Sequence, residues 1–361
     1  MKKAISIINA SRKNDGITVG ILRTASILRN LGYDVKWYQV LDRYTSKHLP
    51  DYDHLIQGFE KLPELISMGI TRTRFVSKRF NISSKSLVLI AEPTLINYMQ
   101  NPMISIVKIH DFRAFTEYSD KILTRFLYRM KIRKMRKIQY AIFTTEFMKK
   151  EAENLGINPS GSVIIKDKPR FSPEKKHMDL SLRHLKNGII TITCISTDRP
   201  YKNLALFLKI AKELHSNDPG GYRFILVSKV GKELSKKIRH ENIVEVVEDV
   251  ADIKDIYHQT DIVIVPSKYE GFCLPLVEAT YFGIPVVSFQ LPPFVELIGN
   301  YDLFQNSDDI SKWIKSIEKL RDPFYYEQIS EYLISRAEAI EAENTEEKLG
   351  LFIDSIFEKA F

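Results

Sequence analysis

Short apolar runs rich in β-branched residues recur along the chain and alternate with stretches of helical periodicity. Two series are evident, and they are Ala4–Ile8, Val35–Tyr38, Leu87–Ile90, Ile104–Ile109 and Tyr140–Phe143, then Ile189–Ile195, Arg223–Val227, Ile243–Val247, Asp261–Val265 and Pro285–Phe289. Runs this short and apolar are typical of strands buried on both faces, and strands that alternate with helices form parallel, doubly wound sheets. The pattern therefore predicts an α/β protein with two such sheets.

A polar segment separates the two series of runs. It covers residues 167–176 and contains two prolines, which interrupt both helix and strand, so we interpret it as an interdomain linker. A chain of 361 residues also exceeds the usual size of a single domain. We therefore predict two domains of similar size, residues 1–169 and 170–344. The remaining stretch is helical in period, with its apolar residues on one side.

The overall charge is positive, because 53 Lys and Arg against 45 Asp and Glu give a net charge of +8. This balance favours an anionic partner such as a nucleotide, a phospholipid or a nucleic acid without selecting among them. No window approaches the ~18 apolar residues of a membrane helix, and the first apolar segment is too short for a signal peptide, so we expect a cytoplasmic protein. Cys194 and Cys273 lie in separate apolar segments without metal-ligand spacing, which predicts reduced, buried thiols.

The segment 266–278 places two carboxylates around a tight turn. It follows an apolar run, turns at Gly271, and enters a helix near Pro275, since proline is tolerated in the first helical turn. Free backbone N–H groups at such a helix start can hold phosphate or sugar oxygens. Glu270 lies in the turn and Glu278 about one turn into the helix, so the two can reach different parts of one long polar ligand. The segment predicts a sugar-nucleotide site.

Three further loops follow predicted strands and carry residues suited to such a ligand. Gly16 ends the loop after the first strand, where helix N–H groups could bind phosphate, although any tight turn also needs a glycine. His110 follows a strand at the edge where α/β proteins bind ligands, but a structural histidine would give the same pattern. Arg199 and Lys202 share a strand-to-helix loop, where two cations either neutralise a diphosphate leaving group or are ordinary surface charges.

The segment 270–278, with Gly271–Phe272 and the later run Gly283–Val287, closely resembles the signature of glycosyltransferase family 4. Members of that family are retaining enzymes of the GT-B fold that use nucleotide-sugar donors. The resemblance implies two Rossmann-like domains facing a cleft, with the acceptor in the first domain, the donor in the second, and a C-terminal helix, residues 345–361, packed back on the first. It also implies sugar transfer to an acceptor hydroxyl with retention of the anomeric configuration, the acceptor being a lipid-linked glycan or another glycoconjugate.

The same resemblance implies roles for individual residues. It makes Glu270 a contact to donor-sugar hydroxyls, and Glu278 the residue that holds the ribose. It makes His110 a sugar contact, Lys202 a contact to the diphosphate, and the backbone of Gly16 a neighbour of that diphosphate and of the acceptor. The predicted catalytic and donor-binding sets are His110, Glu270 and Lys202, and Gly16, Arg199, Lys202, Glu270, Gly271, Phe272, Cys273, Leu274 and Glu278. No catalytic base is assigned.

The chain departs from the family's pattern at three places. Cys273 stands where a small residue such as glycine is usual, and Asp15 replaces the first member of a glycine pair. Thr197 stands where the family has arginine, so either Arg199 substitutes for it or fewer charges hold the leaving group. Glu296 matches a further family carboxylate, and a carboxylate stabilised at a helix start explains it equally well.

Other segments are compatible with more than one interpretation. Residues 121–137 read as a basic amphipathic helix, which either lies on an anionic membrane surface or is a solvated helix covering the first sheet. Residues 42–81 carry several arginines and lysines, and they either shape an acceptor pocket or are ordinary surface. Asp51-Tyr52-Asp53 invites comparison with the metal-binding motif of the other glycosyltransferase fold, but lies far from the nucleotide motifs. We expect no metal, and no cofactor beyond the nucleotide-sugar co-substrate.

Three other kinds of protein are alternatives to a glycosyltransferase. A nucleotide-sugar epimerase or phosphorylase shares the architecture, but the paired glutamates and Lys202 argue against it. A nucleic-acid-binding protein would explain the charge, but the basic segments lack interleaved aromatic residues. A noncatalytic partner subunit is compatible with Thr197 and Cys273, whereas the intact glutamates weigh against it. The expected partners are a nucleotide sugar, a glycan, lipid-linked or protein acceptor, and an anionic inner membrane face, with no nucleic acid.

Overall fold

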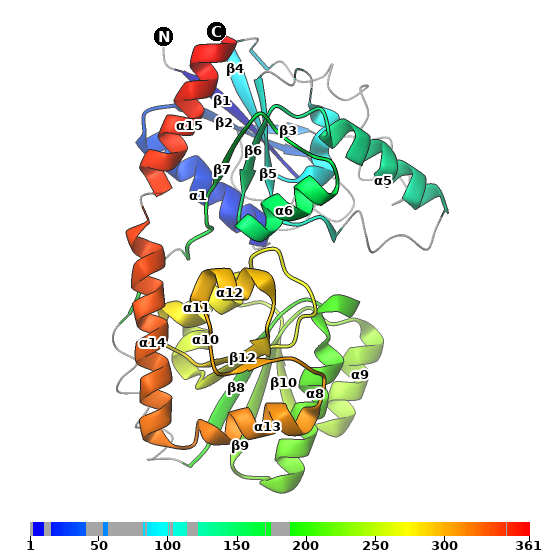
Figure 1. The fold of residues 1–361 in the computed structure, drawn as a ribbon. Coiled ribbons are helices and arrows are strands. Elements are labelled where there is room, and N and C mark those ends of the chain that lie inside the picture. The colour runs from blue at the N-terminus through cyan, green and yellow to red at the C-terminus, as the bar shows by residue number, and fades with distance from the viewer. Residues whose placement is uncertain are drawn as a thin grey trace. The chain divides into compact units, whose positions relative to one another are not determined.

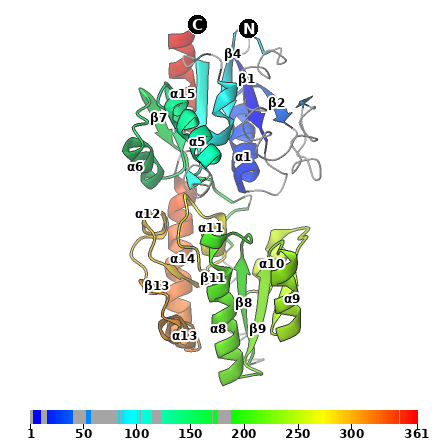
Figure 2. The same ribbon diagram turned by 90° about the vertical axis from the view of Figure 1, so that its right-hand side faces the viewer.

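A computed structural model describes residues 3–10, 16–40, 53–56, 82–83, 85–99, 101, 104–113, 122–169, 171–174, 188–343 and 345–361. The chain forms two compact units, shown in Figure 1 and, from the side, in Figure 2. The N-terminal unit consists of Met1–Asp167 together with Asn344–Phe361, and the C-terminal unit consists of Lys168–Glu343. Each unit is built on its own parallel sheet.

The N-terminal unit contains a sheet of seven parallel strands in the order β3-β2-β1-β4-β5-β6-β7. Its strands are β1 Ala4–Asn9, β2 Asp34–Val40, β3 His54–Ile56, β4 Ser86–Ile90, β5 Ser105–Ile109, β6 Tyr140–Phe143 and β7 Gly161–Ile164. The order reverses direction between β1 and β4, which is the topological switch point of a doubly wound fold. Ligands of such sheets bind at the carboxyl ends of the strands beside that point.

The helices of the N-terminal unit include the C-terminal end of the chain. They are α1 Gly16–Asn30, the short 3₁₀ helix η1 Pro93–Tyr98, α5 Ile122–Met135, α6 Glu146–Asn154 and α15 Thr345–Ala360. Helix α15 contacts α1 and β7. Its apolar side chains Leu349, Ile353 and Ile356 are fully buried in the same cluster as Ile21 and Leu28 of α1. Burial of this stripe attaches the last helix to the first unit.

The C-terminal unit repeats the architecture with six parallel strands in the order β10-β9-β8-β11-β12-β13. Its strands are β8 Ile190–Ile195, β9 Tyr222–Val227, β10 Val244–Val247, β11 Ile262–Val265, β12 Val286–Phe289 and β13 Phe304–Gln305. Its helices are η4 Pro200–Lys202, α8 Leu204–Asn217, α9 Lys232–Glu241, α10 Ile253–Gln259, α11 Leu274–Tyr281, α12 Pro292–Ile298, α13 Ile310–Lys319 and α14 Pro323–Ala342. The switch point lies between β8 and β11.

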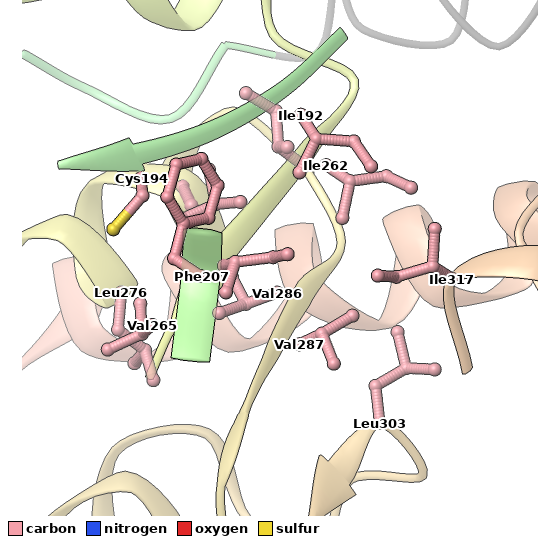
Figure 3. Packing of buried hydrophobic residues seen from close by; sticks show 14 of the residues in the cluster. Ile192, Cys194, Phe207, Ile262, Val265, Leu276, Val286, Val287, Leu303 and Ile317 are labelled. Carbon is pink, nitrogen blue, oxygen red and sulfur yellow. The ribbon is translucent and has the colours of Figure 1, made fainter. Parts of the chain in front are cut away.

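The core of the C-terminal unit holds that switch point rigidly. Figure 3 shows Ile192 of β8 and Ile262 of β11 packed with side chains from neighbouring strands and helices, including Phe207 of α8 and Leu276 of α11. These four side chains are fully buried. Close packing of this kind leaves little freedom for the loops that leave the ends of β8 and β11.

The ten strands predicted from apolar runs are all present. The structure adds β3, β7 and β13, which the sequence pattern missed. Strand β13 has only two residues, and β7 carries no fully buried side chain, so neither produces a continuous apolar run. The prediction of an α/β protein with two doubly wound parallel sheets is confirmed. Within the described ranges, no helix is long and apolar enough to cross a membrane.

Candidate active site

The turn between β11 and α11 brings most of the predicted donor-binding residues together. Helix α11 begins at Leu274 with Pro275 in its first turn, as predicted, and Cys273 is its N-cap. Phe272 is 6 % exposed and belongs to the core of the C-terminal unit, which anchors the turn from inside. Cys273 adopts a left-handed conformation with φ 78°, which favours glycine. The position where the family usually has a small residue is therefore conformationally demanding.

Lys202 and Glu270 meet at the switch point of the C-terminal sheet. Lys202 ends the short helix after β8, Glu270 lies in the loop after β11, and these two strands are neighbours. The Lys202 Nζ donates to Glu270 Oε1 at 2.6 Å, with the side chains 19 % and 9 % exposed. Burial by itself would lower the pKa of Lys202, but the negative charge of Glu270 outweighs it and raises this pKa above its ordinary value. The lysine is therefore a permanent cation at the site.

Glu278 is oriented by a tyrosine that the sequence analysis did not identify. Tyr257 of α10 is fully buried, and its hydroxyl donates to Glu278 Oε2 at 2.8 Å. Burial, followed by the nearby Glu278 charge, raises the pKa of Tyr257 well above its ordinary value, so the phenol stays a donor. The ring stacks on Phe282 with centroids 5.2 Å apart. Nothing in the spacing of Tyr257 and Glu278 signals this contact, because it depends on how α10 packs against α11.

The thiol of Cys273 lies among the three charged groups of the site. Burial is the main reason that the pKa of Cys273 is raised well above its usual value, and the charges of Glu270, Lys202 and Glu278 also act on it. The thiol of Cys194, on β8, likewise has its pKa raised to about 12 by burial. Both cysteines are free and buried, which confirms the prediction for them.

The remaining predicted residues of the C-terminal unit lie nearby along the chain. Arg199 is exposed at the N-cap of η4, on the same loop as Lys202, and Thr197 is also exposed. Gly271 is buried beside Glu270. Glu296 is the fifth residue of a seven-residue helix, α12, and not in its first turn, so the interpretation as a helix-start carboxylate is wrong.

In the N-terminal unit, His110 follows β5 as predicted and is 9 % exposed. Its Nδ1 lies 3.2 Å from Asp167 Oδ2, and Lys108 Nζ lies 2.5 Å from Asp167 Oδ1. Burial alone would raise the pKa of Asp167, but the positive charge of Lys108 and the hydrogen bond from His110 hold it well below its ordinary value. Asp167 was expected in a polar linker, yet it is 4 % exposed. Neither Asp167 nor Lys108 was predicted as a site residue.

Several predictions fall partly or wholly outside the described residues. Gly16 is the exposed first residue of α1, whereas residues 11–15 of its loop are not described. Most of the segment 42–81 and two residues of the Asp-Tyr-Asp motif are also not described. The third residue of that motif, Asp53, accepts a hydrogen bond from the Trp37 backbone. In the parts of the chain with described side chains, no group of three or more His, Cys, Asp or Glu could hold a metal ion.

The predicted basic helix corresponds to α5, whose side chains are described from residue 128 onward. Arg129 and Arg133 are exposed, and so is the apolar Met130. Lys131 is 3 % exposed, and its Nζ lies 5.7 Å from the centroid of the Tyr128 ring. Lys131 is therefore part of the packing under this helix and not part of its exposed basic surface.

Comparison with known proteins shows which proteins the chain resembles. Residues 183–336 match the model of the family described as glycosyl transferases group 1. The chain is 26 % identical over 234 residues to the O-antigen chain mannosyltransferase RfbU of Salmonella typhimurium, covering 60 % of this chain and 61 % of that protein. It is 28 % identical over 104 residues to an uncharacterized glycosyltransferase of Haemophilus influenzae, covering 28 % and 30 %. The chain thus matches less than two thirds of the length of these curated relatives.

Solved structures share the fold of this chain. TarM superposes with a TM-score of 0.71 at 13 % identity, covering 99 % of both chains. Anabaena Alr3699/HepE, solved with UDP and glucose, has a TM-score of 0.69 at 16 % identity and the same coverage. The predicted GT-B fold is confirmed. The predicted class of enzyme, a glycosyltransferase, agrees with the family match over residues 183–336.

Proposed function

We propose that the protein transfers a sugar from a nucleotide-sugar donor to an acceptor hydroxyl with retention of the anomeric configuration, as a member of glycosyltransferase family 4. The observation that carries the proposal is the ion pair of Lys202 with Glu270 at the switch point. Glu270 lies in the turn that leads into α11, and α11 carries Glu278. A cation and two carboxylates match the three parts of the donor, which are a diphosphate, a sugar and a ribose.

Lys202 stabilises the nucleotide diphosphate as it leaves. Negative charge grows on the diphosphate oxygens when the bond to the sugar breaks, and a fixed cation in a largely water-excluded site stabilises that charge. An ammonium group has three N–H donors, of which one is directed at Glu270. The others can meet phosphate oxygens while Glu270 keeps the lysine in place. Arg199, exposed on the same loop, adds a second charge without replacing this anchor.

The two glutamates divide the rest of the donor between them. Glu270, with the backbone N–H groups of Gly271 and Phe272, binds sugar hydroxyls, because carboxylates accept strong hydrogen bonds from them. Glu278 accepts the ribose hydroxyls with one side of its carboxylate while Tyr257 holds Oε2 from the other. In the N-terminal unit, the same resemblance makes His110 a sugar contact. This assignment follows the family resemblance, and the pre-oriented carboxylates support it.

The acceptor is a glycan or glycoconjugate, and residues 121–137 hold the protein at an anionic membrane surface from the cytoplasmic side. The name of the Salmonella relative, an O-antigen chain mannosyltransferase, supports a surface-glycan acceptor. The exposed Arg129, Met130 and Arg133 support membrane contact, since basic and apolar side chains together suit a headgroup region. Transfer requires no metal, because Lys202 supplies the charge at the leaving group.

Thermal-shift measurements with UDP, GDP, ADP, CMP and their sugar conjugates test the donor site. A ligand that binds only the folded state raises the melting temperature. At a ligand concentration a hundredfold above Kd, it raises the free energy of unfolding by about 2.7 kcal/mol. One nucleotide should stabilise the protein, Glu278→Ala should abolish that shift, and Glu331→Gln, an exposed carboxylate on α14, should leave it unchanged. No shift with any nucleotide would refute the donor site. A shift without turnover on any acceptor would favour a noncatalytic partner subunit.

A further inference from the structure

A sealed ion pair lies behind His110 in the N-terminal unit. Lys108 is 0 % exposed on β5, and its ammonium donates to Asp167 Oδ1, to the Gly20 carbonyl at 3.1 Å and to Thr24 Oγ1 at 3.0 Å. These contacts use all three of its donors. Lys108 therefore has no capacity left for a ligand, and its charge acts only on Asp167.

The surroundings of Asp167 are shaped for a carboxylate. A Cβ added to Gly20 would lie 2.5 Å from Asp167 Oδ2, closer than any side chain can approach, so the helix must carry glycine where the carboxylate packs. The second oxygen, Oδ2, lies 3.2 Å from His110 Nδ1. Because Lys108 keeps the carboxylate ionised, it can only accept a hydrogen bond, and Nδ1 must carry the proton.

His110 then has one nitrogen left, and it is buried without a partner. Its Nε2 makes no hydrogen bond to any of the described residues. Buried polar atoms normally have partners, and one without a partner at the carboxyl end of a strand in this fold points to a ligand. With the proton on Nδ1, the neutral ring offers Nε2 as an acceptor, which suits a hydroxyl and not a carbonyl or a phosphate.

We propose that Asp167, held by Lys108, is a positioning residue that fixes His110 in the Nδ1–H form, so that Nε2 accepts a hydrogen bond from a hydroxyl of the bound sugar. The identity of the ligand rests on the function proposed above, whereas the form of the imidazole does not. Asp167 never touches the sugar and acts through His110.

Nitrogen NMR of the full chain tests the form of the His110 imidazole, without any nucleotide sugar. Protein labelled with ¹⁵N-histidine is measured at about pH 8, where an ordinary imidazole is neutral, and His110→Ala assigns the signals. We expect a protonated Nδ1 and a bare Nε2 in the wild type. Lys108→Met/Asp167→Ala, which removes the acceptor without leaving a buried charge, should shift the ring toward the Nε2–H form that free imidazole favours. Wild-type signals from an Nε2–H ring would overturn the proposal.

Turnover tests the hydrogen bond between the sugar and His110 Nε2, using the nucleotide sugar on which the wild type is active. We expect kcat/KM to fall about tenfold in Lys108→Met/Asp167→Ala, the range for a hydrogen bond to a well-positioned group. Because Asp167 acts through His110, the same pair of changes should cost less than about twofold in a His110→Ala background. Independent, multiplying effects would mean that the ion pair only supports folding, and would overturn the proposal. Absence of turnover by the wild type would refute the proposed function, and the NMR result would still decide the tautomer.

Discussion

Each unit contains a lysine paired with a carboxylate from a distant part of its chain, and the two pairs differ in their exposure to solvent. Lys108 and Asp167 have side chains 0 % and 5 % exposed, whereas Lys202 and Glu270 are 19 % and 9 % exposed. Lys108 uses all three of its N–H donors in hydrogen bonds to protein atoms. Lys202 directs one of its three donors at Glu270. A closed pair can only hold its neighbours in place, while an open pair can share its charge with a ligand.

The closed pair should be the more important for stability. Lys108→Met leaves the Asp167 carboxylate buried without its counter-charge, and breaking a buried pair in this way costs about 3–5 kcal/mol. Urea denaturation should show the free energy of unfolding lowered by that amount. Lys108→Met/Asp167→Asn, which removes both charges, is the matched control and should recover most of the loss. A double variant as unstable as Lys108→Met would mean that lost packing, and not the unpaired charge, causes the loss.

The pH dependence of stability sharpens the same distinction. The folded-state pKa of Asp167 is depressed below its ordinary value, so its ion pair stabilises the fold above about pH 4 and that contribution is lost as the pH falls below this value. Between pH 6 and pH 3, wild-type stability should therefore fall more steeply than that of Lys108→Met. Parallel curves for the two proteins would show that Asp167 does not carry the acid sensitivity.

The open pair should be the more important for turnover. Lys202→Met removes the cation at the leaving group, and loss of one such electrostatic contact costs about 10²- to 10³-fold in kcat. Its effect on unfolding should be smaller than that of Lys108→Met, because Glu270 lies nearer to water once unpaired. Steady-state kinetics with a fixed donor would measure this, with Lys268→Met, at an exposed lysine of the loop that carries Glu270, as the control. Equal destabilisation by Lys202→Met and Lys108→Met would remove the difference between the pairs.

Tyr257 offers a milder way to perturb the open site. Tyr257→Phe keeps the ring stacked on Phe282 but removes the hydroxyl that orients Glu278. A single hydrogen bond of this kind is worth about 0.5–1.5 kcal/mol, so we expect nucleotide Kd to rise about threefold to tenfold. Isothermal titration calorimetry would detect the change, and Tyr222→Phe on β9 serves as the control. Unchanged affinity would mean that Glu278 needs no support to bind.

The smallest effect is expected for Cys273→Gly, at the left-handed N-cap of α11. Cys273→Gly removes the strain of a side chain at φ 78° but also its buried contacts, so stability should change by less than about 1 kcal/mol. Cys273→Val introduces a β-branched side chain at the same angle and should lower stability by at least about 2 kcal/mol. Thermal unfolding of both variants measures the difference, and equal stabilities would argue against strain at this turn.

Local pattern accounts for the elements and for the candidate donor turn. Apolar runs predicted ten of the strands, and Pro275 marked the start of α11 where the structure has it. The same reasoning could not detect β13, because two residues make no pattern. It also treated Asp167 as part of a linker, because a polar residue in a proline-containing segment is typical of a loop whether or not an ion pair buries it.

What the sequence alone determined is therefore the class of fold, the strands and the motif-bearing turns, because each depends on residues close together in the chain. Which residues meet was decided by tertiary structure. Strand order sets β8 beside β11 and so brings Lys202 to Glu270, 68 positions apart. Packing of α10 on α11 brings Tyr257 to Glu278, and the return of the chain after β7 brings Asp167 to Lys108. Contacts between distant segments depend on the order of strands in each sheet and on how helices pack. Local periodicity in the sequence specifies neither.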